Sequence, residues 1–124
     1  MDTLVLQGKI ENLLSSVSNL LLIGNHIGYI YADEFSDLNH DIHNQINELY
    51  PLRGNTVEQD ANLCLAILMG YSVSVYANPE DEFKKRKVLV RSQRLLQTLS
   101  PSFLQRQLSS TYNELLYQLN EAYY

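Results

Sequence analysis

The segment 56–78 constrains the fold of this chain more than any other stretch. Asn55 or Thr56 suits the N-cap position of a helix there, and Glu58 and Gln59 are placed to complete a capping box. Apolar residues then occupy almost the whole circumference of the predicted helix, which is typical of a helix buried on every side. A membrane span would need about 20 apolar residues, and polar residues interrupt this run. We therefore predict a buried central helix over about residues 56–77.

Four other segments carry the apolar periodicity of amphipathic helices, and cap, proline or glycine signals mark their ends. They are predicted over about Thr3–Leu22, about Asp33–Tyr50, from Asn78 to about Leu99, and from Ser100-Pro101 onward. Residues 26–32 are predicted to form a loop that packs back through its tyrosines. Very short joints between the last three helices predict antiparallel neighbours. The predicted fold class for residues 1–124 is therefore all-α, a single-domain bundle of about five helices around the central helix.

The composition agrees with one helical domain. The chain has 124 residues with only 5 Gly and 3 Pro, and a chain of this length can bury about two-thirds of its unfolded surface. Its single cysteine, Cys64, excludes an internal disulfide, and a place in the central helix predicts a small buried apolar residue. No charged and then apolar leader precedes the first amphipathic segment, so a cytoplasmic location is expected.

The net charge of −5 is divided unequally along the chain. Residues 1–60 carry nine acidic and two basic residues, which gives −7, whereas the remainder has a net charge of +2. An acidic half is unfavourable for non-specific binding to nucleic acid and suits a basic protein partner. The alternative is that these charges serve only the solubility of the domain.

One cluster has the residue types of a metal site, namely Asp37, His40, Asp41 and His43. Asp37 and His40 share the polar face of the predicted helix, but His43 lies about 60° away from His40. A transition metal needs three convergent ligands and supporting outer-shell contacts, so we expect a solvated polar face and no metal. The sequence also has no glycine-rich phosphate loop, nucleophile elbow or other catalytic motif. We therefore expect neither a cofactor nor enzymatic activity.

A charged run, EDEFKKRK at residues 80–87, opens the predicted fourth helix. Its acids lie in the first turn and each precedes a base by four residues, an arrangement that stabilises a helix by itself. The cations left over form a basic stripe of three residues, Lys87, Arg91 and Arg94. Such a stripe could contact phosphate or an acidic protein, although three charges more often form a solvated face.

The block from Glu48 to Asn78 resembles the conserved part of a known family. Its likeness lies in LYPLRGNT, in E-x-D-A-x-L-C-L-A-I-L-M-G-Y and in Tyr76 and Asn78. IYADEFSDLN upstream and VLVRSQRLLQTLSPSFLQRQL downstream resemble that family more loosely. On these residues the chain is identified as a member of the UpxZ family of transcription antitermination antagonists.

The resemblance implies a function that composition and periodicity do not. Members of the family are small cytoplasmic proteins encoded in capsular-polysaccharide operons. They oppose UpxY proteins, which are NusG-like elongation factors, and so limit which polysaccharide is made. The resemblance therefore implies a regulator that binds a UpxY-type, NusG-like antiterminator, with no catalysis and no membrane contact.

We also predict where that partner binds. On the second predicted helix, acidic residues fall within about 80° of one another, on the side opposite the apolar stripe. This acidic stripe leads into a tyrosine and an arginine, residue types that are enriched at protein-binding hot spots. The predicted partner-binding residues are Asp33, Asp37, Asp41, Glu48, Tyr50 and Arg53.

Two alternatives stay open at this point. The first is a helical nucleic-acid-binding regulator that uses the basic stripe. Its affinity for nucleic acid would fall steeply with added salt. The second is a non-catalytic helical scaffold, which the absence of a 34-residue repeat disfavours. Direct binding to nucleic acid is not what we expect.

Overall fold

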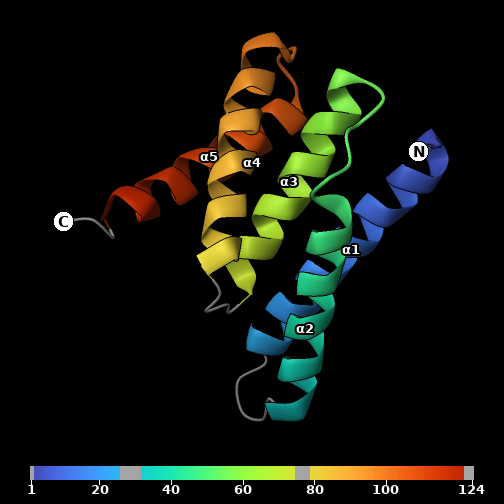
Figure 1. The fold of residues 1–124 in the computed structure, drawn as a ribbon, viewed down its shortest axis with the longest axis vertical. Coiled ribbons are helices and arrows are strands. Elements are labelled where there is room, and N and C mark those ends of the chain that lie inside the picture. The colour runs from blue at the N-terminus through green and yellow to red at the C-terminus, as the bar shows by residue number, and fades with distance from the viewer. Residues whose placement is uncertain (1, 26–31, 75–78, 122–124) are drawn as a thin grey trace.

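The computed structural model describes residues 2–25, 32–74 and 79–121, which form five α-helices with no strand among them (Figure 1). The predicted all-α class is confirmed. None of the helices in these ranges has the length and apolar character needed to cross a membrane. The helices are α1 (Thr3–Asn25), α2 (Ala32–Leu49), α3 (Val57–Val73), α4 (Pro79–Thr98) and α5 (Phe103–Glu121).

Helix α3 is the centre of the fold, as predicted. It packs against each of the other four helices, and Figure 1 shows it between the α1–α2 pair and the α4–α5 pair. Its buried residues point in all directions around the helix: Gln59, Ala61, Leu63, Cys64, Leu65, Ala66, Ile67, Leu68, Gly70 and Tyr71. The apolar circumference seen in the sequence is therefore explained by burial on every side.

The N-terminus of α3 has the predicted capping box. The Thr56 hydroxyl accepts a hydrogen bond of 3.0 Å from the Gln59 N–H. In return, the Gln59 side chain accepts one of 2.9 Å from the Asn55 N–H. The Gln59 amide also donates to the Thr3 carbonyl at 2.9 Å, so the cap joins the start of α1 to the start of α3. These bonds satisfy the Gln59 N–H of the first turn and fix the backbone that enters the helix.

The end of α3 differs from the prediction. The helix stops at Val73, and Ser74 has an extended backbone with ψ of 154°. The hydroxyl of Ser72 donates to the Met69 carbonyl at 2.8 Å, a local bond that competes with helix continuation. Residues 75–78, which include Tyr76 and the predicted helix start at Asn78, lie outside the described residues.

The other helix ends show two further differences. Helix α1 continues to Asn25, beyond the predicted end at Leu22. Of the predicted loop at 26–32, Ala32 already belongs to α2, and residues 26–31 lie outside the described residues. Helix α5 begins at Phe103, because the Ser102 hydroxyl accepts the Gln105 N–H at 3.1 Å and acts as its cap. The predicted start at Ser100-Pro101 was therefore two residues early. Figure 1 shows α4 returning antiparallel to α3, as predicted, and α5 turning back to cross α4 obliquely.

Among the described side chains, apolar residues of the amphipathic helices form the core, although not every apolar position is buried. Leu21 of α1 is 46% exposed, whereas its neighbour Leu20 is 3% exposed. Adjacent residues on a helix lie about 100° apart, so one narrow stripe cannot bury both. The buried members of α1, α2 and α5 include Leu6, Ile10, Leu13, Val17, Leu20, Ile42, Ile46, Leu49, Leu108 and Leu115.

Gly70 of α3 lies at a close crossing with α2. A Cβ built at Gly70 would lie 2.7 Å from Ile46 Cδ1 and 3.4 Å from Ile42 Cγ2. We expect Gly70→Leu to lower the free energy of unfolding by about 1–3 kcal/mol through overpacking, although leucine has a higher helix propensity than glycine. Gly8→Leu is the matched control, because a Cβ at Gly8 meets nothing within 4 Å. Equal melting temperatures for the two variants would contradict this packing.

Candidate protein-interaction surface

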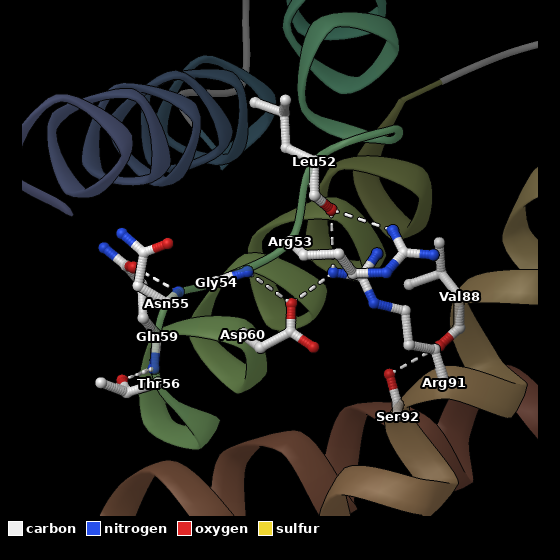
Figure 2. A network of polar contacts seen from close by, with 10 residues as sticks. All are labelled: Leu52, Arg53, Gly54, Asn55, Thr56, Gln59, Asp60, Val88, Arg91 and Ser92. Atoms are coloured by element: carbon white, nitrogen blue, oxygen red, sulfur yellow. Dashed lines mark hydrogen bonds and ion pairs between the residues drawn. The ribbon is translucent and has the colours of Figure 1, made fainter. Parts of the chain in front are cut away.

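A network of polar contacts fixes the connector between α2 and α3, defined here as residues 50–56 (Figure 2). Arg91 of α4 forms an ion pair with Asp60 of α3, and its guanidinium also donates to the Leu52 carbonyl at 3.0 Å. The Asp60 carboxylate in turn accepts the Gly54 N–H at 2.8 Å. These four residues, which we call the clamp, hold the connector against both α3 and α4.

Gly54 is the residue that lets the connector approach so closely. A Cβ built there would overlap the backbone nitrogen of Asp60 and lie 2.5 Å from its Cα. Real Cβ atoms do not come this close to a neighbouring backbone, so no larger side chain fits without movement. The LRGNT sequence and the aspartate six residues after its glycine are thus explained by one structural unit.

The clamp changes the interpretation of the basic stripe. Arg91 is paired with Asp60 and its side chain is 14% exposed, so it does not belong to a solvated row of cations. Lys87 and Arg94 are exposed, as predicted. The pair joins residues 31 positions apart, and helical periodicity cannot reveal a partner on another helix.

A groove of about 930 Å³ lies beside the clamp, between the connector and α4. Its lining includes the clamp pair, Asp60 and Arg91, together with Leu95 and Val88 of the core side of α4. Phe83 is also part of the lining and is 58% exposed. The groove therefore combines a fixed polar pair with accessible apolar surface. We call it the basic groove and define it by six lining residues, Tyr50, Arg53, Phe83, Lys87, Val90 and Arg94.

The groove lining carries a net positive charge, whereas the whole chain carries a net negative charge. The lining contains five of the nine Lys and Arg residues but a single acid, in a chain of net charge −5. Asp60 neutralises Arg91, and Glu82 lies 3.9 Å from Arg86. The remaining cations have no acidic partner among the residues that the structure describes: Arg53, Lys87 and Arg94.

The predicted acidic stripe lies elsewhere on α2. Asp37 and Asp41 are exposed, and Glu48 is 54% exposed and paired with Lys9 of α1. Asp41 and Glu48 line a polar hollow of about 400 Å³ against α1. The side chain of Asp33 lies outside the described residues.

The structure thus divides the predicted partner-binding residues between two surfaces. Tyr50 and Arg53 line the basic groove, whereas Asp41 and Glu48 line the hollow beside α1. Tyr50 is half-buried, and the Lys84 ammonium lies 5.4 Å from the centre of its ring. Because side chains around one helix can face different neighbours, a run of residues along the sequence need not form one surface. The role of each surface in binding stays a prediction.

In the charged run at the start of α4, Glu82 pairs with Arg86 at the predicted spacing of four, and Lys85 lies 3.2 Å from Glu82 at a spacing of three. Asp81 lies 3.7 Å from His43 of α2, and Lys84 donates to Asn47 of α2 at 3.0 Å. These side chains therefore connect α4 to α2. His43 is half-buried in this contact, whereas the other members of the predicted polar face, Asp37, His40 and Asp41, are exposed.

Cys64 is the one cysteine of the chain, and its surroundings make it unreactive. The side chain is fully buried in α3, as predicted. Burial raises the pKa of the Cys64 thiol from 9.0 to about 11, with Arg91 acting in the opposite direction. The thiolate is the nucleophilic form, so this thiol is inert near neutral pH.

Comparison with known proteins places the chain among regulators of transcription. The model of the UpxZ family of transcription anti-terminator antagonists matches residues 10–114, a range that contains the clamp and the basic groove. A crystal structure of a transcription anti-terminator antagonist UpxZ from Bacteroides uniformis ATCC 8492 is similar, with 31% sequence identity and a TM-score of 0.67. That similarity covers 90% of this chain and 73% of the other. A search of curated proteins found no match.

Proposed function

Because this chain belongs to the UpxZ family of transcription anti-terminator antagonists, we propose that it opposes a UpxY-type, NusG-like anti-terminator by binding that protein. The observation that carries the proposal is the family match over residues 10–114, which spans nearly the whole helical domain. The regulated genes are capsular-polysaccharide operons, and the place of action is the cytoplasm, where transcription takes place.

The mechanism we propose is sequestration without catalysis. The domain binds the anti-terminator and prevents its productive engagement with RNA polymerase or nascent transcript. One feature of the surface supports binding to a protein, namely a groove with exposed apolar side chains. Exposed apolar surface beside charges is typical of sites that bind proteins.

A direct test is complex formation between the purified chain and its UpxY-type anti-terminator. We expect the two proteins to co-elute in size-exclusion chromatography after nuclease treatment, and to bind in a calorimetric titration without nucleic acid. If the chain binds a single-stranded RNA oligonucleotide and not the anti-terminator, the proposed function is wrong.

The acidic stripe of α2 is proposed to steer the partner's basic surface toward the domain. Exposed charges act mainly through the association rate, and that effect weakens as salt rises. We expect Asp37→Lys with Asp41→Lys to slow association with the anti-terminator several-fold at low salt, by stopped-flow or surface kinetics. Glu48 is left unchanged, because it is paired with Lys9.

The matched control reverses two exposed acids elsewhere, Glu11 of α1 and Glu114 of α5. Glu11→Lys with Glu114→Lys produces the same change in net charge and leaves the α2 surface intact. Association rates within twofold of each other for the two double variants, at low and at moderate salt, would show that the stripe has no steering role.

A further inference from the structure

We propose that the basic groove binds an acidic segment of the anti-terminator, with an apolar side chain of that segment seated against Phe83 and Val90. This inference rests on the proposed function and goes beyond it, because it names a second surface and the chemistry of its ligand. It also differs from the steering role of the acidic stripe, since the groove would attract charges of the opposite sign.

Charge complementarity is the first argument. Arg53 comes from the connector, whereas Lys87 and Arg94 come from α4, so cations of two elements converge on one groove. They have no acidic partner among the described residues, and the whole chain carries −5. A local positive site in an acidic protein selects for an acidic ligand and rejects a basic one.

The apolar part of the groove is the second argument. Phe83 is 58% exposed and Val90 is 50% exposed, and both line the groove with the cations. The Lys87 ammonium lies 4.8 Å from the centre of the Phe83 ring, so the charge and the apolar surface are adjacent. A segment with an apolar side chain flanked by carboxylates would contact both the apolar surface and the cations of the groove. Many protein interfaces have such an apolar centre and polar rim.

Rigidity is the third argument. The connector side of the groove is fixed by the clamp, in which Arg91 binds both Asp60 and the Leu52 carbonyl. The backbone beside Arg53 is therefore fixed before a ligand arrives, and the Arg53 guanidinium donates to the Leu52 carbonyl at 3.0 Å. A preformed site loses less conformational entropy on binding, which raises affinity for a given set of contacts.

A protein segment fits this groove better than RNA does. Arg91 is neutralised by Asp60, and Arg86 lies beside Glu82, so three cations of the lining are left without an acidic partner among the described residues. Affinity for nucleic acid comes mainly from neutralised phosphates, and a few cations within an acidic chain supply little of it. The lining includes two aromatic rings, Tyr50 and Phe83, but its aliphatic surface at Val90 suits an apolar side chain and offers no stacking platform for a base.

The test compares groove variants with matched variants outside the groove. Phe83→Ala and Arg94→Glu alter the groove, whereas Phe103→Ala and Arg106→Glu make the same changes at exposed positions of α5. Binding of each purified variant to the anti-terminator is measured by calorimetry, with circular dichroism to verify the fold. We expect each groove variant to raise Kd at least tenfold and each α5 variant to change it less than twofold. Arg94→Lys should keep most of the affinity.

The outcomes distinguish a failure of the groove proposal from a failure of the proposed function. Binding by the parent chain with no loss in the groove variants would overturn the groove and leave the proposed function intact. A parent chain that does not bind the anti-terminator would overturn both. Two further results would also overturn the proposal: single-stranded RNA binding lost in Arg94→Glu, or a dimer in sedimentation that Phe83→Ala converts to monomer.

Discussion

Gly54→Ala should lower the free energy of unfolding by about 3 kcal/mol, a large effect for one added methyl group. The added Cβ would overlap the Asp60 backbone nitrogen and lie 2.5 Å from the Asp60 Cα. These are backbone atoms at the start of α3, so no side-chain rotation can relieve the overlap. Relief requires the connector to move away, which also breaks the Gly54 hydrogen bond to Asp60.

The comparison for this variant is Gly8→Ala in α1, where a Cβ meets nothing within 4 Å. We expect Gly8→Ala to raise stability by about 0.5–1 kcal/mol, because alanine favours a helix over glycine. Urea denaturation of both variants measures the difference, provided that the slope of the transition is unchanged. A Gly54→Ala variant as stable as the parent would show that the connector does not lie against α3 as described.

Arg91→Met should lower the free energy of unfolding by about 3 kcal/mol. The substitution keeps an apolar stem but leaves the Asp60 carboxylate without its cation. It also removes one of the two hydrogen bonds to the Leu52 carbonyl, which keeps the one from Arg53 at 3.0 Å. Removing one partner of a buried pair is costly because the other charge stays desolvated. The two side chains are 14% and 15% exposed, so we expect the lower end of the range for buried pairs.

Arg86→Met is the matched control, since Arg86 is exposed and pairs with Glu82 at 3.9 Å on the same helix. An exposed ion pair of this kind contributes roughly 0–1 kcal/mol. A double-mutant cycle with Asp60→Asn then isolates the coupling between Asp60 and Arg91. Additive losses in that cycle, or equal losses for the two arginine variants, would contradict a structural role for the clamp.

The sequence predicted the central helix well because the signals for it are local. The all-round apolar pattern of residues 57–71 and the capping box at Thr56 and Gln59 depend on neighbours within a few positions. The apolar stripes of α1 and α2 are likewise defined by residues three or four positions apart in the sequence. Leu21 shows the limit, because periodicity alone does not say where a stripe narrows.

The clamp and the groove depend on contacts that periodicity cannot reveal. Arg91 had the spacing of a basic stripe, yet its partner, Asp60, lies on another helix. Tyr50 and Arg53 follow the acidic stripe along the sequence, but they face α4 whereas Asp41 and Glu48 face α1. Only the packing of helices around α3 decides which side chains share a surface. The family resemblance pointed to the LRGNT block, and the structure explains that block by its fold.

The measurement that tests the account most directly is transcription through a terminator in a reconstituted system of RNA polymerase and a UpxY-type anti-terminator. We predict that adding this chain restores termination when the anti-terminator is present, and leaves termination unchanged when it is absent. A chain that alters termination without the anti-terminator, or that leaves read-through unchanged at saturating concentration, would contradict antagonism through binding to that protein.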